Sequence, residues 1–151
     1  MIEIIFDASK LKVTMSKMAE KVKDYSQPFE KAGNDLIDYF GKDVFDSQGE
    51  QSTGLGWRRL AESTLYMRAN HYGYYANRAE REDHILVWTG RLRRGFVKRV
   101  DQTHLVIGNN VEYFPYHQLG GGRLPQRKML TLNRAVVATI KTRIEEHIEK
   151  I

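Results

Sequence analysis

The stretch FVKRVDQTHLVIG, residues 96–108, decides the fold class of this chain. Two runs of strand-forming residues, Phe96–Val100 and His104–Gly108, flank the short polar connection Asp101-Gln102-Thr103. Such runs, joined over so short a distance, are typical of an antiparallel hairpin. The alternation predicts one apolar face, made of Val97, Leu105 and Ile107. We therefore expect a small antiparallel sheet built around this hairpin.

The chain upstream of the hairpin has strand and helix signals. Ile2–Phe6 predicts a short edge strand, and a helix is expected from Asp7 or Ser9 to about Tyr25. A second helix is expected from Pro28 to about Phe45, because Ser26 can cap it and proline is tolerated in its first turn. The apolar residues of this second helix fall on one face: Phe29, Leu36, Ile37, Phe40 and Val44. Two such helices in succession indicate a packed helical hairpin.

Further helices are expected over residues 62–71 and after Asn133, which can cap a C-terminal helix. Apolar residues recur at helical spacing in that last helix: Val136, Val137, Ile140, Ile144, Ile148 and Ile151. The sequence thus predicts a single α+β domain over residues 1–151, with helices packed on a small antiparallel sheet. Its N-terminal half, 1–72, is helical, and the hairpin and C-terminal helix occupy 84–151.

Two glycine-rich segments separate these elements. Residues 46–56, DSQGEQSTGLG, are polar and without period, and residues 111–130, VEYFPYHQLGGGRLPQRKML, contain three consecutive glycines. Neither composition suits a regular helix or strand, so we expect residues 46–56 and 111–127 to be loops. Between them, Ile85–Trp88 has the character of a strand, and Thr89 can cap a turn of helix over residues 91–94.

Composition excludes several classes of protein. The chain has no cysteine, which rules out disulfides, thiolate metal sites and cysteine nucleophiles. Its start, MIEIIFDASK, lacks the basic residues of a signal peptide, and no apolar run approaches the roughly 20 residues of a membrane span, so no membrane partner is expected. The net charge of +5 favours acidic partners, although an ordinary basic surface explains so small an excess.

Catalytic patterns are weak. The five histidines are scattered, and no serine lies in a nucleophile-elbow pattern. Glu80, Glu82 and Asp83 beside His84 form the one group that could bind a divalent ion, which leaves a metal-dependent enzyme as a third, least favoured class. We expect neither an enzyme nor a cofactor.

A basic run supports an alternative function, a nucleic-acid-binding module over residues 91–99. Its charged residues are Arg91, Arg93, Arg94, Lys98 and Arg99. In a strand, however, Lys98 and Arg99 point to opposite faces, which divides the charge. Contact with a specific nucleic acid is therefore not expected. The alternative that DNA passes close to this run inside a particle is left open.

Four segments come in a recognisable order and spacing: GLGWRRLAEST (54–64), ILVWTGRLRRGF (85–96), VIGNNVEYFPYHQLGGG (106–122) and LPQRKML (124–130). They resemble the phage virion morphogenesis, or tail-completion, family of Mu-like and related contractile-tailed phages and prophages. The positions that carry the resemblance are Gly54, Trp57, Leu60 and Thr64; Leu86, Thr89, Gly90 and Leu92; Tyr113, His117, Gln118 and Gly120; and Pro125, Arg127 and Leu130. The departures are Phe114, Leu119, Gln126, Lys128 and Met129.

The resemblance implies a non-catalytic assembly protein that acts in tail completion or head–tail joining, as a ring of identical subunits. The expected partners are other copies of the chain and a tail-tube, sheath or head–tail connector protein. The expected location is the cytoplasm of the bacterial host during assembly, with incorporation into the virion left open. Whether the chain comes from a phage or a prophage is also left open.

Particular residues are assigned to this function. The candidate assembly surface consists of Tyr113, His117, Gln118, Gly120 and Arg127, and the candidate basic surface of Arg91, Arg93, Arg94 and Lys98. His117 and Gln118 have a second interpretation, in which they satisfy backbone groups of the glycine loop. Trp57, Trp88 and Leu92 are expected to anchor the loops in the core. The two loops are expected to be mobile in the monomer and to become ordered on assembly.

Overall fold

A three-stranded antiparallel sheet in the order β1-β3-β2 forms one layer of the structure, a computed structural model that describes residues 2–8, 23–73 and 84–150. The hairpin predicted from the sequence is confirmed as β2 (Phe96–Val100) and β3 (His104–Asn109), with Val100 paired to Leu105. On its other side β3 pairs with β1 (Glu3–Asp7), which is the predicted edge strand.

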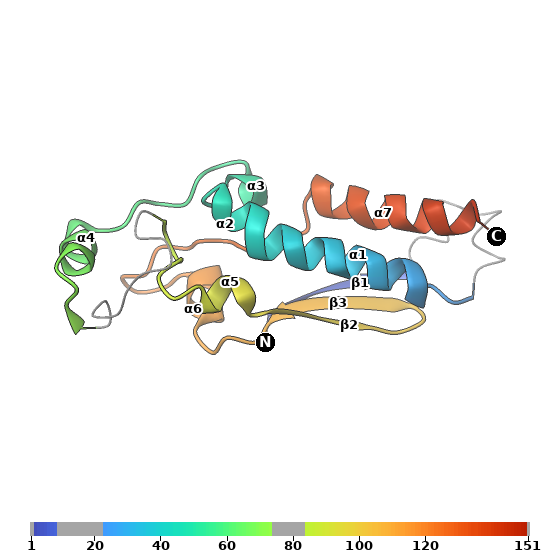
Figure 1. Ribbon diagram of the computed structural model, residues 1–151, viewed down its shortest axis with the longest axis horizontal. Helices are drawn as coiled ribbons and strands as arrows, with labels where there is room; N and C mark the ends of the chain where they lie inside the picture. The colour runs from blue at the N-terminus through green and yellow to red at the C-terminus, as the bar shows by residue number, and fades with distance from the viewer. Residues whose placement is uncertain (1, 9–22, 74–83, 151) are drawn as a thin grey trace.

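Two long helices cover one face of this sheet (Figure 1). The first is α1 (Ser26–Asp38), which continues through the π-helical turn η3 (Tyr39–Asp43) into α2 (Val44–Asp46), so the second predicted helix is confirmed. The other is α7 (Arg134–Ile148), capped as expected by Asn133, whose Oδ1 accepts a hydrogen bond from the Val136 amide at 3.0 Å. The α+β class is therefore correct.

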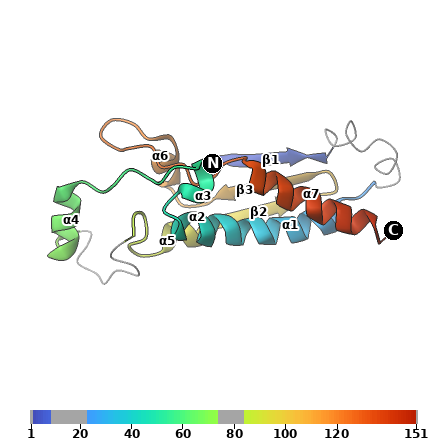
Figure 2. The same ribbon diagram turned by 90° about the horizontal axis from the view of Figure 1, so that it is seen from above.

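The inner face of the sheet meets both helices in the core. Residues from all these elements surround one void of about 10 Å³: Ile4, Phe6, Leu36, Phe40, Leu105, Ile107, Val136 and Ile140. Viewed from above, α1 and α7 run side by side along the strands (Figure 2). Arg143 of α7 donates from Nε to Asp35 of α1 at 2.7 Å, which adds an ion pair across the helix interface.

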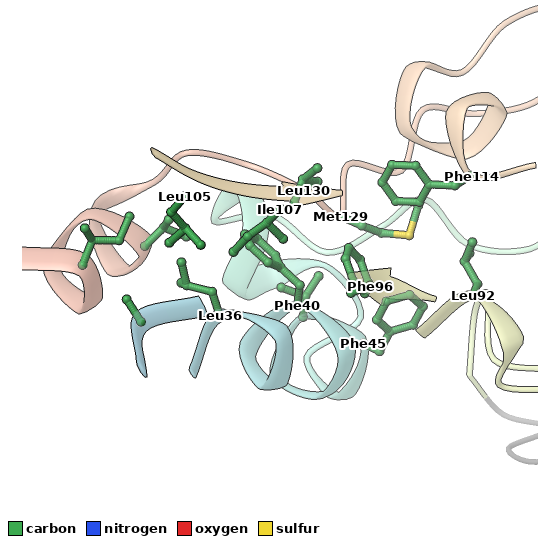
Figure 3. Packing of buried hydrophobic residues seen from close by; sticks show 14 of the residues in the cluster. Leu36, Phe40, Phe45, Leu92, Phe96, Leu105, Ile107, Phe114, Met129 and Leu130 are labelled. Carbon is green, nitrogen blue, oxygen red and sulfur yellow. The ribbon is translucent and has the colours of Figure 1, made fainter. Parts of the chain in front are cut away.

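An aromatic cluster extends the core beyond the sheet. Phe96 is the first residue of β2, and its ring stacks on that of Phe40 with the ring centroids 5.7 Å apart. It also makes edge contacts with Phe45 and with Phe114, at centroid distances of 6.4 and 5.8 Å. Figure 3 shows these rings close to Met129 and Leu130. The cluster connects the sheet to α6 (Phe114–Leu119).

The apolar faces predicted for two elements need correction. Val97 pairs with Gly108 and lies 38% exposed on the outer face of the sheet, whereas Phe96 and Val100 share the inner face with Leu105. The register of the hairpin pairs Val100 with Leu105, so these two residues share the inner face. Because side chains alternate along the strand, Phe96 also faces inward and Val97 faces outward. In α7, Val136, Ile140 and Ile144 are buried as expected, but Val137 is 42% exposed.

Three expectations of irregular or extended structure are wrong. Residues 46–56 contain α3 (Glu50–Thr53), whose Ser52 is buried beside Thr131. Residues 111–130 contain α6. Ile85–Trp88 is not a strand; it turns at Leu86, whose φ is +61°. In each segment, contacts with residues distant in sequence outweigh local composition.

Other elements agree with expectation or lie outside the described residues. The helix expected over residues 62–71 is α4 (Glu62–Ala69), and the turn expected after Thr89 is α5 (Arg91–Arg94). The helix expected to end at Tyr25, and with it the helical hairpin, falls mainly on residues 9–22, which the structure does not describe. Among the described helices, α7 packs on α1. Among the described helices, none has both the length and the apolar character to cross a membrane.

Gly41 generates the first testable prediction, because it allows η3 to approach the backbone of α5. A Cβ at this position would lie 2.7 Å from the carbonyl oxygen of Arg93. We expect Gly41→Ala to reduce the free energy of unfolding by about 1–3 kcal/mol, the usual cost of overpacking. Equilibrium urea unfolding measures it, with the exposed neighbour Lys42→Ala as the control. A Gly41→Ala protein as stable as the control would contradict the close packing of these backbones.

Candidate functional site

A groove of about 600 Å³ lies at the end of the molecule that carries α4. Its walls come from residues 58–68, from 86–92 around α5, and from 113–127, which include α6 and the turn after it. Figures 1 and 2 show α4 and the turn after α6 extending from this end, away from the layer of sheet and helices. The groove is thus formed where segments far apart in the sequence meet.

All four sequence segments that carry the resemblance contribute to the groove. Its lining includes Leu60 and Thr64 from the first, Leu86, Thr89 and Leu92 from the second, Tyr113 and His117 from the third, and Pro125 and Arg127 from the fourth. The glycines of these motifs and Gln118 are not in its lining. The fold therefore brings most of the motif side chains together at one place.

The groove is strongly basic. Among the described residues, its lining contains six arginines and a single carboxylate, that of Glu62; the arginines are Arg58, Arg59, Arg68, Arg91, Arg123 and Arg127. Arginine side chains therefore dominate the described part of its lining.

Two of these arginines lie against aromatic rings of the groove. The guanidinium of Arg68 is 5.1 Å from the ring centroid of Trp88, and that of Arg91 is 5.9 Å from the ring centroid of Tyr113. Arg68 is buried and donates from Nη1 to the carbonyl of His84 at 2.9 Å. Such contacts restrict the side chains and hold their positive charge in place.

Arg127 is buried and supports the wall of the groove. It donates from Nε and Nη2 to the carbonyl of Arg58, at 3.2 and 3.1 Å. The sequence placed Arg127 on an assembly surface; the structure places it 5% exposed, with these bonds inside the chain. Its role in the monomer is to connect the segment after α6 with the segment after Trp57.

Gln118 is also buried, and it satisfies backbone groups. Its Oε1 accepts hydrogen bonds from the amides of Met129 and Leu130 at 2.8 and 3.1 Å, and its Nε2 donates to the Leu130 carbonyl at 2.7 Å. The amide side chain therefore pairs with an extended segment as a neighbouring strand would. The interpretation of Gln118 as a structural residue agrees with this geometry, although the backbone groups lie beyond the glycine loop.

His117 lies half-buried in the groove next to Tyr113, with ring centroids 6.1 Å apart. Its Nδ1 is buried and has no hydrogen-bond partner among the described residues. Burial lowers the pKa of His117, and the nearby positive charge of Arg127 lowers it further. The imidazole is therefore held in its neutral form.

The presence of glycine at position 120 is explained by the backbone around it. Its φ is +69°, and a Cβ there would lie 2.7 Å from the backbone nitrogen of Gln126. The next glycine, Gly121, exchanges both backbone hydrogen bonds with Leu124, at 2.9 and 3.0 Å, closing a tight turn. The three glycines thus fold the chain back on itself after α6.

The predicted basic surface is not one surface. Arg91 lines the groove, whereas Arg94 donates to the carbonyl of Thr89 at 2.7 Å and Arg93 is half-buried. Lys98 points to the opposite side of the sheet from Arg99 and bonds to α1, through the Glu30 carboxylate and, at 2.7 Å, Asn34 Oδ1. The division of charge that strand alternation predicted is confirmed.

The expected anchors are all buried. Trp57 donates from Nε1 to the Lys128 carbonyl at 3.0 Å, and Trp88 and Leu92 are at most 4% exposed. Of the possible metal site, Glu80, Glu82 and Asp83 lie outside the described residues. In the part of the chain that is described, no three potential metal-binding side chains come together.

Sequence reasoning missed Arg58, Arg59, Arg68 and Arg123 as site residues. The one local signal was the Arg-Arg pair directly after Trp57. No periodicity connects these residues with Arg91 or Arg127, because the groove is assembled from segments that are distant along the chain.

Comparison with known proteins yields one family. A model described as the phage virion morphogenesis family matches residues 6–149 of the chain. No curated protein and no solved structure matches it.

Gln118 generates the second prediction. Gln118→Leu would leave the Met129 and Leu130 amides and the Leu130 carbonyl without this partner in a buried place. Each buried polar group without a hydrogen bond costs about 1–3 kcal/mol, so a loss of at least ~2 kcal/mol in the free energy of unfolding is expected. Urea unfolding measures it, with the exposed Gln27→Leu as the control. Equal stability of the two variants would argue against the pairing.

The pKa of His117 generates the third prediction. A pKa below the ordinary value of 6.5 means that the unfolded chain binds a proton more readily than the folded chain. The stability contributed by the neutral imidazole is complete above about pH 6.5 and decreases as the pH falls towards the lowered pKa. We expect the free energy of unfolding, measured with urea, to decrease between about pH 7.5 and about pH 5.5. This decrease should be smaller in His117→Phe than in the native sequence. A loss of equal size in both proteins would refute this assignment.

Proposed function

Because the chain belongs to the phage virion morphogenesis family, we propose that it is a non-catalytic subunit that forms a ring during tail completion or head–tail joining. The observation that carries this proposal is the position and surface of α4. This helix extends from the body formed by the sheet, α1 and α7 (Figure 1). A helix in this position gains stability when it packs on another molecule.

The surface of α4 is suited to such packing. Three consecutive apolar residues, Leu65, Tyr66 and Met67, are 49%, 61% and 39% exposed, and Tyr72 just beyond the helix is 55% exposed. Burial of apolar area is the main favourable term in protein association, at roughly 25 cal/mol per Å². Aromatic residues and methionine are also enriched at interfaces. We name residues 58–72 the α4 arm.

A second surface lies on α6 and the turn after it. Tyr116 and Leu119 are 65% and 64% exposed, and Leu124 is 45% exposed. A closed ring of identical subunits needs two different, complementary surfaces on each copy. In the proposal the α4 arm of one copy packs on the α6 surface of the next. Tyr113, His117 and Gly120 then lie close to the contact, and Gln118 and Arg127 support it from inside the chain.

The chemistry of the groove favours a structural role. Among the described residues its charged groups are nearly all guanidinium groups, which have hydrogen-bond donors and no acceptor and so do not serve as general bases. Burial lowers the pKa of its histidine, and no described residue hydrogen-bonds to the buried Nδ1 to orient the ring as a catalytic base.

The proposed partners are further copies of the chain and a tail-tube, sheath or connector protein, met in the bacterial cytoplasm during assembly. The ring then either stays in the virion or leaves after assembly. A specific nucleic-acid ligand is not part of the proposal, because residues 91–99 present their charges in different directions.

The fourth prediction tests the α4 arm. Leu65→Ser/Tyr66→Ser should shift the oligomer towards monomer in sedimentation velocity, with unchanged thermal stability of the monomer because both side chains are exposed. Leu132→Ser/Val137→Ser removes exposed apolar side chains elsewhere and should leave the oligomer intact. If the native chain is monomeric by itself, the measurement is repeated with purified tail-tube or connector protein added. A native chain that stays monomeric in all these mixtures would refute the ring.

A further inference from the structure

Four arginine side chains of the groove have no hydrogen-bond or ion-pair partner in the described structure, and the only contact of their guanidinium groups that is seen is that of Arg91 with the Tyr113 ring. The guanidinium groups of Arg58, Arg59, Arg91 and Arg123 make no hydrogen bond and no ion pair with any described residue. Arg68 and Arg127, by contrast, hydrogen-bond to backbone carbonyls. The groove therefore presents several unpaired positive groups around one concave space. Repulsion among them makes an anionic occupant favourable.

We propose that this groove binds an extended acidic peptide segment of a partner protein, with aspartate or glutamate carboxylates paired to Arg58, Arg59, Arg91 and Arg123. Guanidinium groups form paired hydrogen bonds with carboxylates in a fixed geometry. A concave site lined by one sign of charge also raises the local potential. The proposal concerns the partner's chemistry and does not require the ring.

The apolar part of the lining distinguishes this site from a simple anion site. Leu60, Leu86, Leu124 and Pro125 line the same space as the arginines. A free phosphate or sulfate would leave these side chains uncovered. A peptide that alternates carboxylates with leucine-like residues covers them, because successive side chains of an extended chain point in opposite directions. The occupant is therefore both acidic and partly apolar.

The same observations favour a peptide over nucleic acid. Single-stranded nucleic acid binds by stacking its bases on open aromatic faces. In this groove the Trp88 ring is 4% exposed and lies against Arg68, and the Tyr113 ring lies against Arg91. The groove volume of about 600 Å³ is in the range of sites that enclose a small ligand.

The fifth prediction tests this site by fluorescence anisotropy with the full chain. The probe is a fluorescein-labelled peptide of alternating glutamate and leucine, and the matched peptide has glutamine in place of glutamate. Arg59→Glu/Arg123→Glu reverses two exposed charges of the groove. Arg99→Glu/Arg134→Glu makes the same change in net charge at exposed positions outside it. We expect the groove variant to bind the acidic peptide at least ~10-fold more weakly, and the control variant to bind it as the native chain does.

Thermal melting checks that each variant is folded, and Arg123→Ala replaces the double variant if that one unfolds. Weak binding of the glutamine peptide by the native chain supports the proposal. It is overturned if the native chain does not bind the acidic peptide, or if the two charge variants weaken binding equally. It is also overturned if a labelled single-stranded oligothymidine binds more tightly than the peptide and loses affinity in the groove variant. Sedimentation of the same samples reports the ring separately, so failure of one proposal is distinguishable from failure of the other.

Discussion

The packing of Phe96 is the interaction on which the rest of the structure depends. It is the first residue of β2, and its ring contacts Phe40 and Phe45 from the long helix and Phe114 from α6. Each aromatic pair contributes about 0.5–1.5 kcal/mol beyond the area that it buries. The ring thereby connects the sheet, the helical layer and the end of the molecule that carries the groove.

Between this cluster and the groove, buried side chains hold the backbone in place by hydrogen bonds. Gln118 pairs with Met129 and Leu130, Trp57 donates a hydrogen bond to the Lys128 carbonyl, and the Ser52 hydroxyl hydrogen-bonds to that of Thr131. Side chains therefore satisfy backbone groups of residues 128–130 where a sheet would use a neighbouring strand. This arrangement holds in place the segment that follows Arg127 of the groove wall. It also explains why polar side chains are buried so near the site.

The groove and the α4 arm divide the interactions of an assembly protein between electrostatic and apolar surfaces. The described lining of the groove is rich in arginine, and the arm exposes the apolar side chains of Leu65, Tyr66 and Met67. Charge complementarity mainly gives specificity and speed of association, whereas apolar burial gives affinity. Because both features occur at the same end of the molecule, the proposed binding of an acidic segment would lie close to the proposed contact between subunits.

Local signals in the sequence determined the hairpin, the long helix and the capped C-terminal helix. Strand alternation around Asp101–Thr103, the apolar spacing from Phe29 to Val44 and the capping by Asn133 all act within a few residues. The motif order was enough to indicate the family. Tertiary structure decided the rest: the hairpin register turned Val97 outward, long-range contacts made a helix of residues 114–119, and Leu86 took a left-handed turn. The groove could not be read from the sequence, because its arginines come from segments that only folding brings together.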